Sequence, residues 1–217
     1  NTIAGLRGWT QALQLPGADV SRATGRIDFL SRQVEREIRD HRTLLLAENG
    51  QLVAEHAPVQ TGALLHDAQV VFSGHPAARD RRLELGPPAD DVELLTDRSL
   101  LLRILVNMVR NALEATPPGG AVRLRCEEEP GRGAVRFSVH NAGAMPPEVQ
   151  ARVFQRSFST KGRGRGLGTY GMKLVGERYL CGEVSFTSTP AAGTTFSIRV
   201  PARLPPLPVA RLGGWCR

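Results

Sequence analysis

The chain has 217 residues, of which 41% are hydrophobic and 23% charged, and it carries a formal net charge of +7. This length and composition predict a globular protein with one core of ordinary size and an appendage, and since no run of about 18 apolar residues occurs, no membrane-spanning helix is expected. The basic residues are scattered, only 5% of the residues are aromatic and no RNA- or DNA-binding motif appears, so nucleic acid is not an expected partner.

The N-terminal part of the chain has the pattern of two helices joined by a turn. Apolar residues recur at helical spacing over residues 2–15, and after a Pro-Gly pair either Asp19 or Ser21 can cap a second helix that runs to about Glu48. Two helices joined in this way form an antiparallel hairpin, which we assign to residues 1–52. Because the second helix is much longer than the first, part of its apolar stripe lacks a cover. This indicates that more of the first helix precedes the chain and that the hairpin forms a homodimer.

Beyond the hairpin, short strands and helices follow one another. Helices are predicted at 64–72, at 100–115 with Asp97 or Ser99 as cap, at 147–154 and at 169–179, and strands at 82–85, 92–95, 121–127, 134–140, 183–187 and 194–200. This order lacks the strict strand–helix alternation of a doubly wound sheet. It predicts an α+β fold with a sheet that carries helices on one face, followed by a Pro-rich tail at 202–217.

Two asparagines and a later glycine-rich loop have the features of a nucleotide site. Asn107 and Asn111 lie four residues apart in a predicted helix, so both amide oxygens face one side, where they can reach a cation. In the segment KGRGRGLG (161–168) the glycines leave the backbone free to wrap a phosphate, just before the next helix begins. A phosphate loop and an amide-lined cation site together predict a bound Mg-nucleotide.

The same segments resemble a known family. LRILVNMVRNALEA (102–115) resembles the asparagine box of the Bergerat-fold ATPases, which comprise histidine kinases, gyrase-type topoisomerases, MutL-type repair proteins and the 90-kDa chaperones. VHNAGAMPPEVQARVFQRSFSTKGRGRGLGTYGMKLV (139–175) resembles the two glycine boxes of histidine kinases, and GTTFSIRVP (193–201) resembles the last strand of their ATP-binding domain. The resemblance implies a two-layer α/β sandwich over 53–201, with a mixed sheet and helices on one face, that binds ATP and Mg²⁺.

The helical hairpin resembles the dimerisation and phosphotransfer hairpin of sensor histidine kinases, and NTIAGLRGW (1–9) resembles the stretch just after their phosphoacceptor box. This resemblance implies that the γ-phosphate of ATP passes to a histidine upstream of Asn1 and then to an aspartate of a response-regulator receiver domain. It also implies a cytoplasmic domain of a protein that can be membrane-anchored. His41 is a weaker acceptor candidate, because the acceptors of the family lie on the first helix.

The resemblance gives roles to individual residues, although no residue of this chain is assigned as catalytic. It implies that Asn111 is the Mg²⁺ ligand and that Asn107 contacts a phosphate or a metal-bound water. Phe154 and Phe158 are expected to form the base of the lid over the nucleotide. The lid residues expected to surround the phosphates are Lys161, Arg163, Gly164, Arg165, Gly166, Leu167 and Gly168.

The adenine end departs from the family pattern. Asn141 and Gly143 stand where the family has an Asp-x-Gly-x-Gly box, so an uncharged amide oxygen would accept the hydrogen bond of the adenine amine. An alternative register puts His140 at the aspartate position, and Thr195 is implied to assist the adenine amine.

Two other functions stay open at this stage. The altered box motivates a pseudokinase that does not bind nucleotide and acts as a dimerisation and signalling module. An anti-sigma-type serine kinase or an ATP-driven clamp is a further alternative, although those proteins lack a preceding helical hairpin.

Overall fold

The computed structural model describes residues 2–15, 19–86, 91–156, 158 and 167–203. The chain divides into two compact units, Asn1–Asn49 and Gly50–Arg217. Within the described residues, no helix combines the length and the apolar character needed to cross a lipid bilayer.

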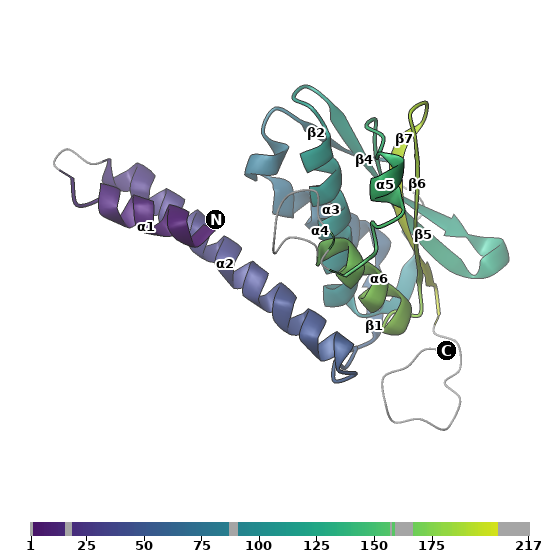
Figure 1. Cartoon of the computed structure of the whole chain (residues 1–217). Coiled ribbons are helices and arrows are strands. Elements are labelled where there is room, and N and C mark those ends of the chain that lie inside the picture. Colours follow the sequence, from purple (N-terminus) through teal and green to yellow (C-terminus); the bar gives the residue numbers. More distant parts are fainter. Residues whose placement is uncertain (1, 16–18, 87–90, 157, 159–166, 204–217) are drawn as a thin grey trace. The chain divides into compact units, whose positions relative to one another are not determined.

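The first unit is a helical hairpin made of α1 (Thr2–Ala12) and α2 (Val20–Glu48) (Figure 1). Asp19 is the cap of α2, since its carboxylate accepts a hydrogen bond of 2.9 Å from the backbone N–H of Arg22. The two helices approach closely at Gly5, where an added Cβ would lie 3.3 Å from a methyl group of Leu30. Two apolar residues of the longer helix, Ile38 and Leu45, are 63% and 55% exposed. The antiparallel hairpin predicted from the sequence is therefore confirmed.

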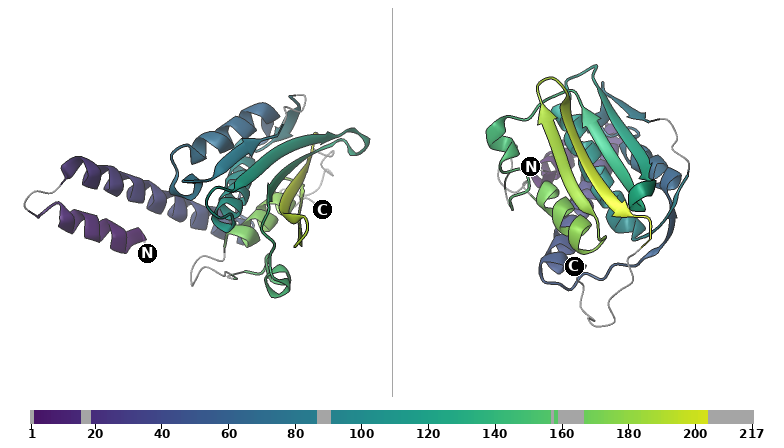
Figure 2. Two further views of the ribbon diagram at one scale, coloured as in Figure 1. Left: turned by 90° about the horizontal axis from the view of Figure 1, so that it is seen from above. Right: turned by 90° about the vertical axis from the view of Figure 1, so that its right-hand side faces the viewer.

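The second unit is built on a five-stranded sheet with the order β2-β4-β5-β7-β6. Its strands are β2 (Arg82–Leu85), β4 (Ala121–Glu129), β5 (Ala134–Asn141), β6 (Glu183–Thr189) and β7 (Gly193–Pro201). The strand β2 runs parallel to β4 and the other neighbouring pairs are antiparallel, so the sheet is mixed. Helices cover one face of it (Figure 2), namely α3 (Thr61–Phe72), α4 (Arg98–Ala115) and α6 (Gly168–Arg178). The predicted α+β fold is confirmed.

Alternation along the strands decides which face of the sheet is covered. Inward residues such as Leu124 and Phe137 are fully buried beneath α4, and Ile198 of β7 is fully buried on the same face near Gly176 of α6. The residues between them are charged or polar, and an example is the Arg123 side chain, which forms an ion pair of 3.1 Å with Glu84 on the open face. Any strand residue can therefore be assigned to the helix side or to the open side from its position.

The remaining elements are short. A separate antiparallel pair joins β1 (Ala57–Gln60) to β3 (Glu93–Thr96), and the one-turn helix α5 (Pro147–Gln150) is shorter than the predicted helix over 147–154. Single 3₁₀ turns occur at η1 (Pro76–Ala78) and η2 (Pro130–Arg132). The sequence predicted the strand near 92–95 but not its partner β1, because β1 contains a proline and buries one residue, Val59, which leaves no alternating pattern to detect.

Cys126 on β4 gives a prediction about reactivity. Burial raises the pKa of the Cys126 thiol from its ordinary value of 9.0 to about 12, so the thiol stays protonated in the folded state. We expect slow alkylation of Cys126 by iodoacetamide at mildly alkaline pH in the native protein and fast alkylation in denaturant, as quantified by mass spectrometry of its peptide. Because the folded-state pKa is the raised one, this thiol contributes stability that is present below pH 9.0 and is lost as the pH rises towards 12. Equal rates in both states would contradict the burial.

Candidate functional site

The helix α4 supplies the two asparagines. It begins after Asp97, whose carboxylate accepts hydrogen bonds from the backbone N–H groups of Leu100, at 3.0 Å, and of Glu55, at 2.9 Å. Asn107 lies in the third turn of α4 among buried apolar residues and is 7% exposed, whereas Asn111 is half-buried one turn later. The spacing therefore places both amides on one side of the helix, as the sequence predicts.

Asn107 meets the first residue of α6. A Cβ added to Gly168 would lie 3.9 Å from the Oδ1 atom of Asn107, so the start of α6 and the middle of α4 are neighbours. Leu167 immediately precedes α6, and its carbonyl accepts a bond of 2.8 Å from the N–H of Gly171 in the first turn. The first N–H groups of a helix have no partner within the helix and favour an anion. The amide of Asn107 therefore lies beside an end of α6 that is suited to phosphate.

A basic side chain that no sequence motif singled out, Arg110, also contacts this group. The guanidinium of Arg110 donates a hydrogen bond to Oδ1 of Asn107. Its place in the sequence, between the two asparagines and three residues after the first, could have indicated this contact. Five predicted lid residues lie outside the described residues: Lys161, Arg163, Gly164, Arg165 and Gly166.

Asn141 is the last residue of β5 and faces the helix side of the sheet. It is 3% exposed, and its Nδ2 atom donates a hydrogen bond of 3.3 Å to the carbonyl of Gly143. Its neighbour His140 points to the open face, where Nε2 lies 2.9 Å from the carbonyl oxygen of Ala192. The structure thus brings Asn141, and not His140, to the side that carries Asn107.

The structure places Thr195 on the open face as well. Thr195 is paired with His140, whereas the residue paired with Asn141 is Thr194, which is 3% exposed. The hydroxyl of Thr194 donates a hydrogen bond of 2.7 Å to the carbonyl of Gly143. Thr194 therefore joins the Asn141 group and Thr195 does not. The alternation of β7, in which Thr194 shares a face with buried Phe196, carried this information in the sequence.

Aromatic rings pack between the segment after α5, the sheet and α6. The ring of Phe154 contacts Phe186 and Phe196 edge-on, at centroid distances of 5.6 and 6.2 Å, and the ammonium of Lys173 lies 5.0 Å from its centroid. Phe158 lies under the guanidinium of Arg152 at 4.6 Å. These contacts attach the segment before the lid to the sheet and to α6.

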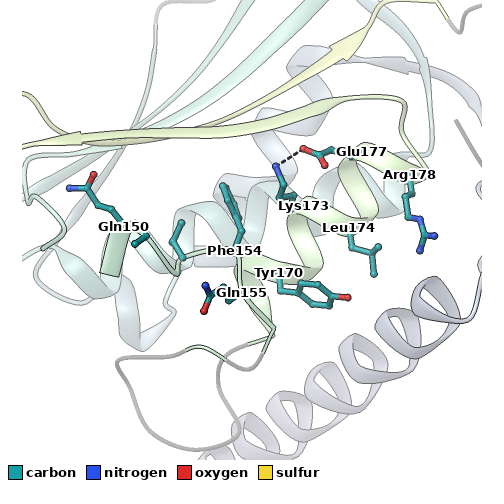
Figure 3. Close-up of a pocket in the computed structure, with 10 residues that line it drawn as sticks. Gln150, Phe154, Gln155, Tyr170, Lys173, Leu174, Glu177 and Arg178 are labelled. Atoms are coloured by element: carbon teal, nitrogen blue, oxygen red, sulfur yellow. Dashed lines mark hydrogen bonds and ion pairs between the residues drawn. The ribbon is translucent and has the colours of Figure 1, made fainter. Parts of the chain in front are cut away.

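An open cleft of about 430 Å³ lies beside the Phe154 ring, between the segment 150–155 and α6 (Figure 3). Tyr170 and Leu174 line it, together with the ion pair of 2.9 Å between Lys173 and Glu177. Of the residues with a sequence-predicted role at the nucleotide site, only Phe154, the predicted base of the lid, is among its lining residues. Asn107, Asn141 and Gly168 do not line this cleft.

Comparison with known proteins agrees with this geometry. Residues 96–204 match the family described as "Histidine kinase-, DNA gyrase B-, and HSP90-like ATPase". The chain is 32% identical over 179 residues to the sensor histidine kinase CusS of Escherichia coli O157:H7. The aligned region covers 79% of this chain and 36% of CusS. It is 27% identical over 208 residues to the probable sensor histidine kinase TcrY of Mycobacterium tuberculosis. That aligned region covers 92% of this chain and 42% of TcrY.

Solved structures give the same result. The catalytic domain of histidine kinase ThkA superposes with a TM-score of 0.61 at 25% identity, over 69% of this chain and 97% of that domain. The chain spans less than half the length of the curated relatives CusS and TcrY.

Proposed function

We infer the function from one premise: the chain belongs to the family of histidine kinase-, DNA gyrase B- and HSP90-like ATPases, and within it to the sensor histidine kinases. We propose that residues 53–201 form the catalytic domain that binds ATP, that residues 1–52 are part of the dimerisation and phosphotransfer hairpin, and that 202–217 are a tail. The observation that carries the proposal is the meeting of Asn107 with Gly168 at the start of α6.

The residues present fit a magnesium nucleotide. Asn111 is the proposed Mg²⁺ ligand because an amide oxygen is a hard donor and its side chain is half-buried beside the Asn107 turn. Mg²⁺, when bound, neutralises charge on the phosphates. Asn107 and the first N–H groups of α6 would hold the phosphates, and Lys161, Arg163 and Arg165 would supply counter-charge to them. At the other end, Asn141 would accept the hydrogen bond of the adenine amine, and the carbonyl of Gly143 holds the other end of the Asn141 amide.

The proposed reaction is transfer of the γ-phosphate to a histidine, which we place upstream of Asn1, and from there to an aspartate of a response-regulator receiver domain. Support comes from two structures that share the fold. Full-length ShkA is described in complex with AMPPNP, at 24% identity and a TM-score of 0.67. ThkA is described in complex with the response regulator TrrA, at 20% identity and a TM-score of 0.64. This domain contributes binding, positioning and charge neutralisation.

A second copy of the chain is the proposed partner of the hairpin. The exposed Ile38 and Leu45 of α2 are apolar residues that a dimer interface would cover. We place this domain in the cytoplasm, where the receiver domain of a response regulator would reach it. The pseudokinase alternative rests on Asn141 alone, and no observation favours it.

Calorimetric titration tests the proposal. The protein is titrated with ADP and with a non-hydrolysable ATP analogue, each with and without Mg²⁺. We expect saturable binding that Mg²⁺ strengthens, because the metal would link the phosphates to α4. No binding at millimolar nucleotide, by a protein that melts cooperatively, would overturn the proposal.

A further inference from the structure

One row of side chains crosses three strands beside Asn141. Ser188 of β6 is paired with Thr194 of β7, and Thr194 is paired with Asn141 of β5. Each of the three lies at a position that faces the helix side of its strand, because the inward residues Phe186, Phe196 and Val139 precede or follow them by two. The row therefore lies at the end of the sheet that carries the adenine residue of the proposed function.

The hydroxyls of this row form a directed chain of hydrogen bonds. The N–H of Met145 donates to Oγ of Ser188 at 2.8 Å, and Oγ of Ser188 lies 2.8 Å from Oγ1 of Thr194. The hydroxyl of Thr194 donates its own hydrogen bond to the carbonyl of Gly143, at 2.7 Å. The proton between the two hydroxyls must then come from Ser188. The hydrogen-bond chain runs from Met145 through Ser188 and Thr194 to Gly143, and neighbouring hydrogen bonds of this kind polarise one another.

This chain of hydrogen bonds holds the loop after β5, residues 142–146, at two backbone groups. One is the carbonyl of Gly143 and the other is the N–H of Met145. Gln150 of α5 adds a third support, since its Nε2 atom donates to the carbonyls of Met145, at 2.8 Å, and Ser188, at 3.3 Å. Ser188 thus contacts the loop through its side chain and Gln150 of α5 through its backbone carbonyl.

The position of the Gly143 carbonyl matters because residue 141 is an asparagine. An aspartate has two equivalent oxygens, whereas an amide has one end that donates and one that accepts. The Nδ2 atom of Asn141 donates to the Gly143 carbonyl, which leaves Oδ1 as the end that can accept. Adenine offers an amine at the position where guanine has a carbonyl oxygen. The orientation of this amide therefore decides which base is preferred.

We propose that Ser188 is a positioning residue for base recognition: through Thr194 and Met145 it fixes the loop 142–146, and so sets the Asn141 amide to accept from adenine. The inference rests on the proposed nucleotide site. It concerns how this chain selects adenine with an asparagine in place of a carboxylate.

The test compares Ser188→Ala with Ser185→Ala. Ser185 is the matched control, because it lies on the same strand and points to the open face. Calorimetry measures the affinities for ADP, GDP and magnesium pyrophosphate. For Ser188→Ala we expect an affinity for ADP that falls about tenfold, a smaller preference for ADP over GDP and an unchanged affinity for pyrophosphate. Ser185→Ala keeps all three values. Amide exchange over 142–150 should quicken in Ser188→Ala alone.

The outcomes separate this inference from the function on which it rests. If the unchanged protein binds ADP and Ser188→Ala binds it with the same affinity and base preference, the inference is wrong and the function stands. If the unchanged protein binds no ADP, both are wrong. Should Ser188→Ala fail to fold, Ser188→Cys keeps the side-chain size with a weaker donor, and an unaltered ADP-to-GDP preference there overturns the inference.

A double-mutant cycle tests the role of the amide itself. In an Asn141→Asp background the two oxygens are equivalent, so Ser188→Ala should reduce the ADP-to-GDP preference less than it does beside Asn141. An equal reduction in both backgrounds would overturn the claim that Ser188 sets the amide.

Discussion

Gly193→Ala is expected to destabilise the second unit by at least about 2 kcal/mol and to disrupt the proposed adenine end of the site. Gly193 begins β7 with φ of +72°, a conformation that costs an L-residue roughly 1–2 kcal/mol. An added Cβ would also overlap the carbonyl oxygen of Asn141 and approach Ala142 Cα to 2.9 Å. Both atoms belong to backbone that cannot rotate away. Relief of the overlap would push the end of β5 away from β7 and displace the Asn141 side chain.

Gly119→Ala is the matched control for this prediction. Gly119 has a similar φ of +81°, but an added Cβ there would have open space around it. Urea denaturation of both variants therefore separates the backbone strain, which they share, from the overlap, which is specific to Gly193. Equal losses of unfolding free energy in the two variants would show that β5 and β7 are not in the close contact described here.

The sequence allowed most of the fold to be predicted where periodicity was strong. The helix α4 is apolar along one side and has an aspartate cap, so its position and the shared side of Asn107 and Asn111 followed from spacing alone. The hairpin of β4 and β5 followed from alternation. In contrast, β1 has four residues with a proline among them, and it exists because β3 pairs with it. Such a strand depends on a partner far along the chain, and local pattern could not reveal it.

The candidate site could be predicted only in part for a related reason. Thr194 and Thr195 are identical in type, and the choice between them needs the direction of each side chain, which alternation in β7 supplies once the strand is placed. Ser188 belongs to no motif recognised in the sequence. Its proposed role depends on the hydrogen bond from the N–H of Met145 to Ser188, which joins segments more than forty residues apart. Side chains that act by supporting a loop are therefore the hardest to identify from a sequence.

Asn111→Ala is expected to remove the Mg²⁺ dependence of nucleotide binding, lowering the affinity for ADP in the presence of Mg²⁺ by at least about tenfold, or 1.4 kcal/mol. The proposed role of Asn111 is to offer an oxygen to the metal, and alanine has none. Without Mg²⁺ the variant and the unchanged protein should bind ADP alike. Stability should hold, because the side chain is half-buried and alanine favours a helix. Calorimetry and thermal melting measure the two effects.

Two further variants decide what the Asn111 result means. Asn111→Asp keeps an oxygen at the same place, so Mg²⁺ should still strengthen nucleotide binding, whereas a role in packing alone would make the alanine and aspartate variants equally weak. Asn49→Ala makes the same chemical change at an exposed residue of the first unit and should leave binding unaltered. If Asn111→Ala kept the full response to Mg²⁺, the metal would have to be held by other atoms. The assignment of the site to α4 would then rest on Asn107 and the start of α6 alone.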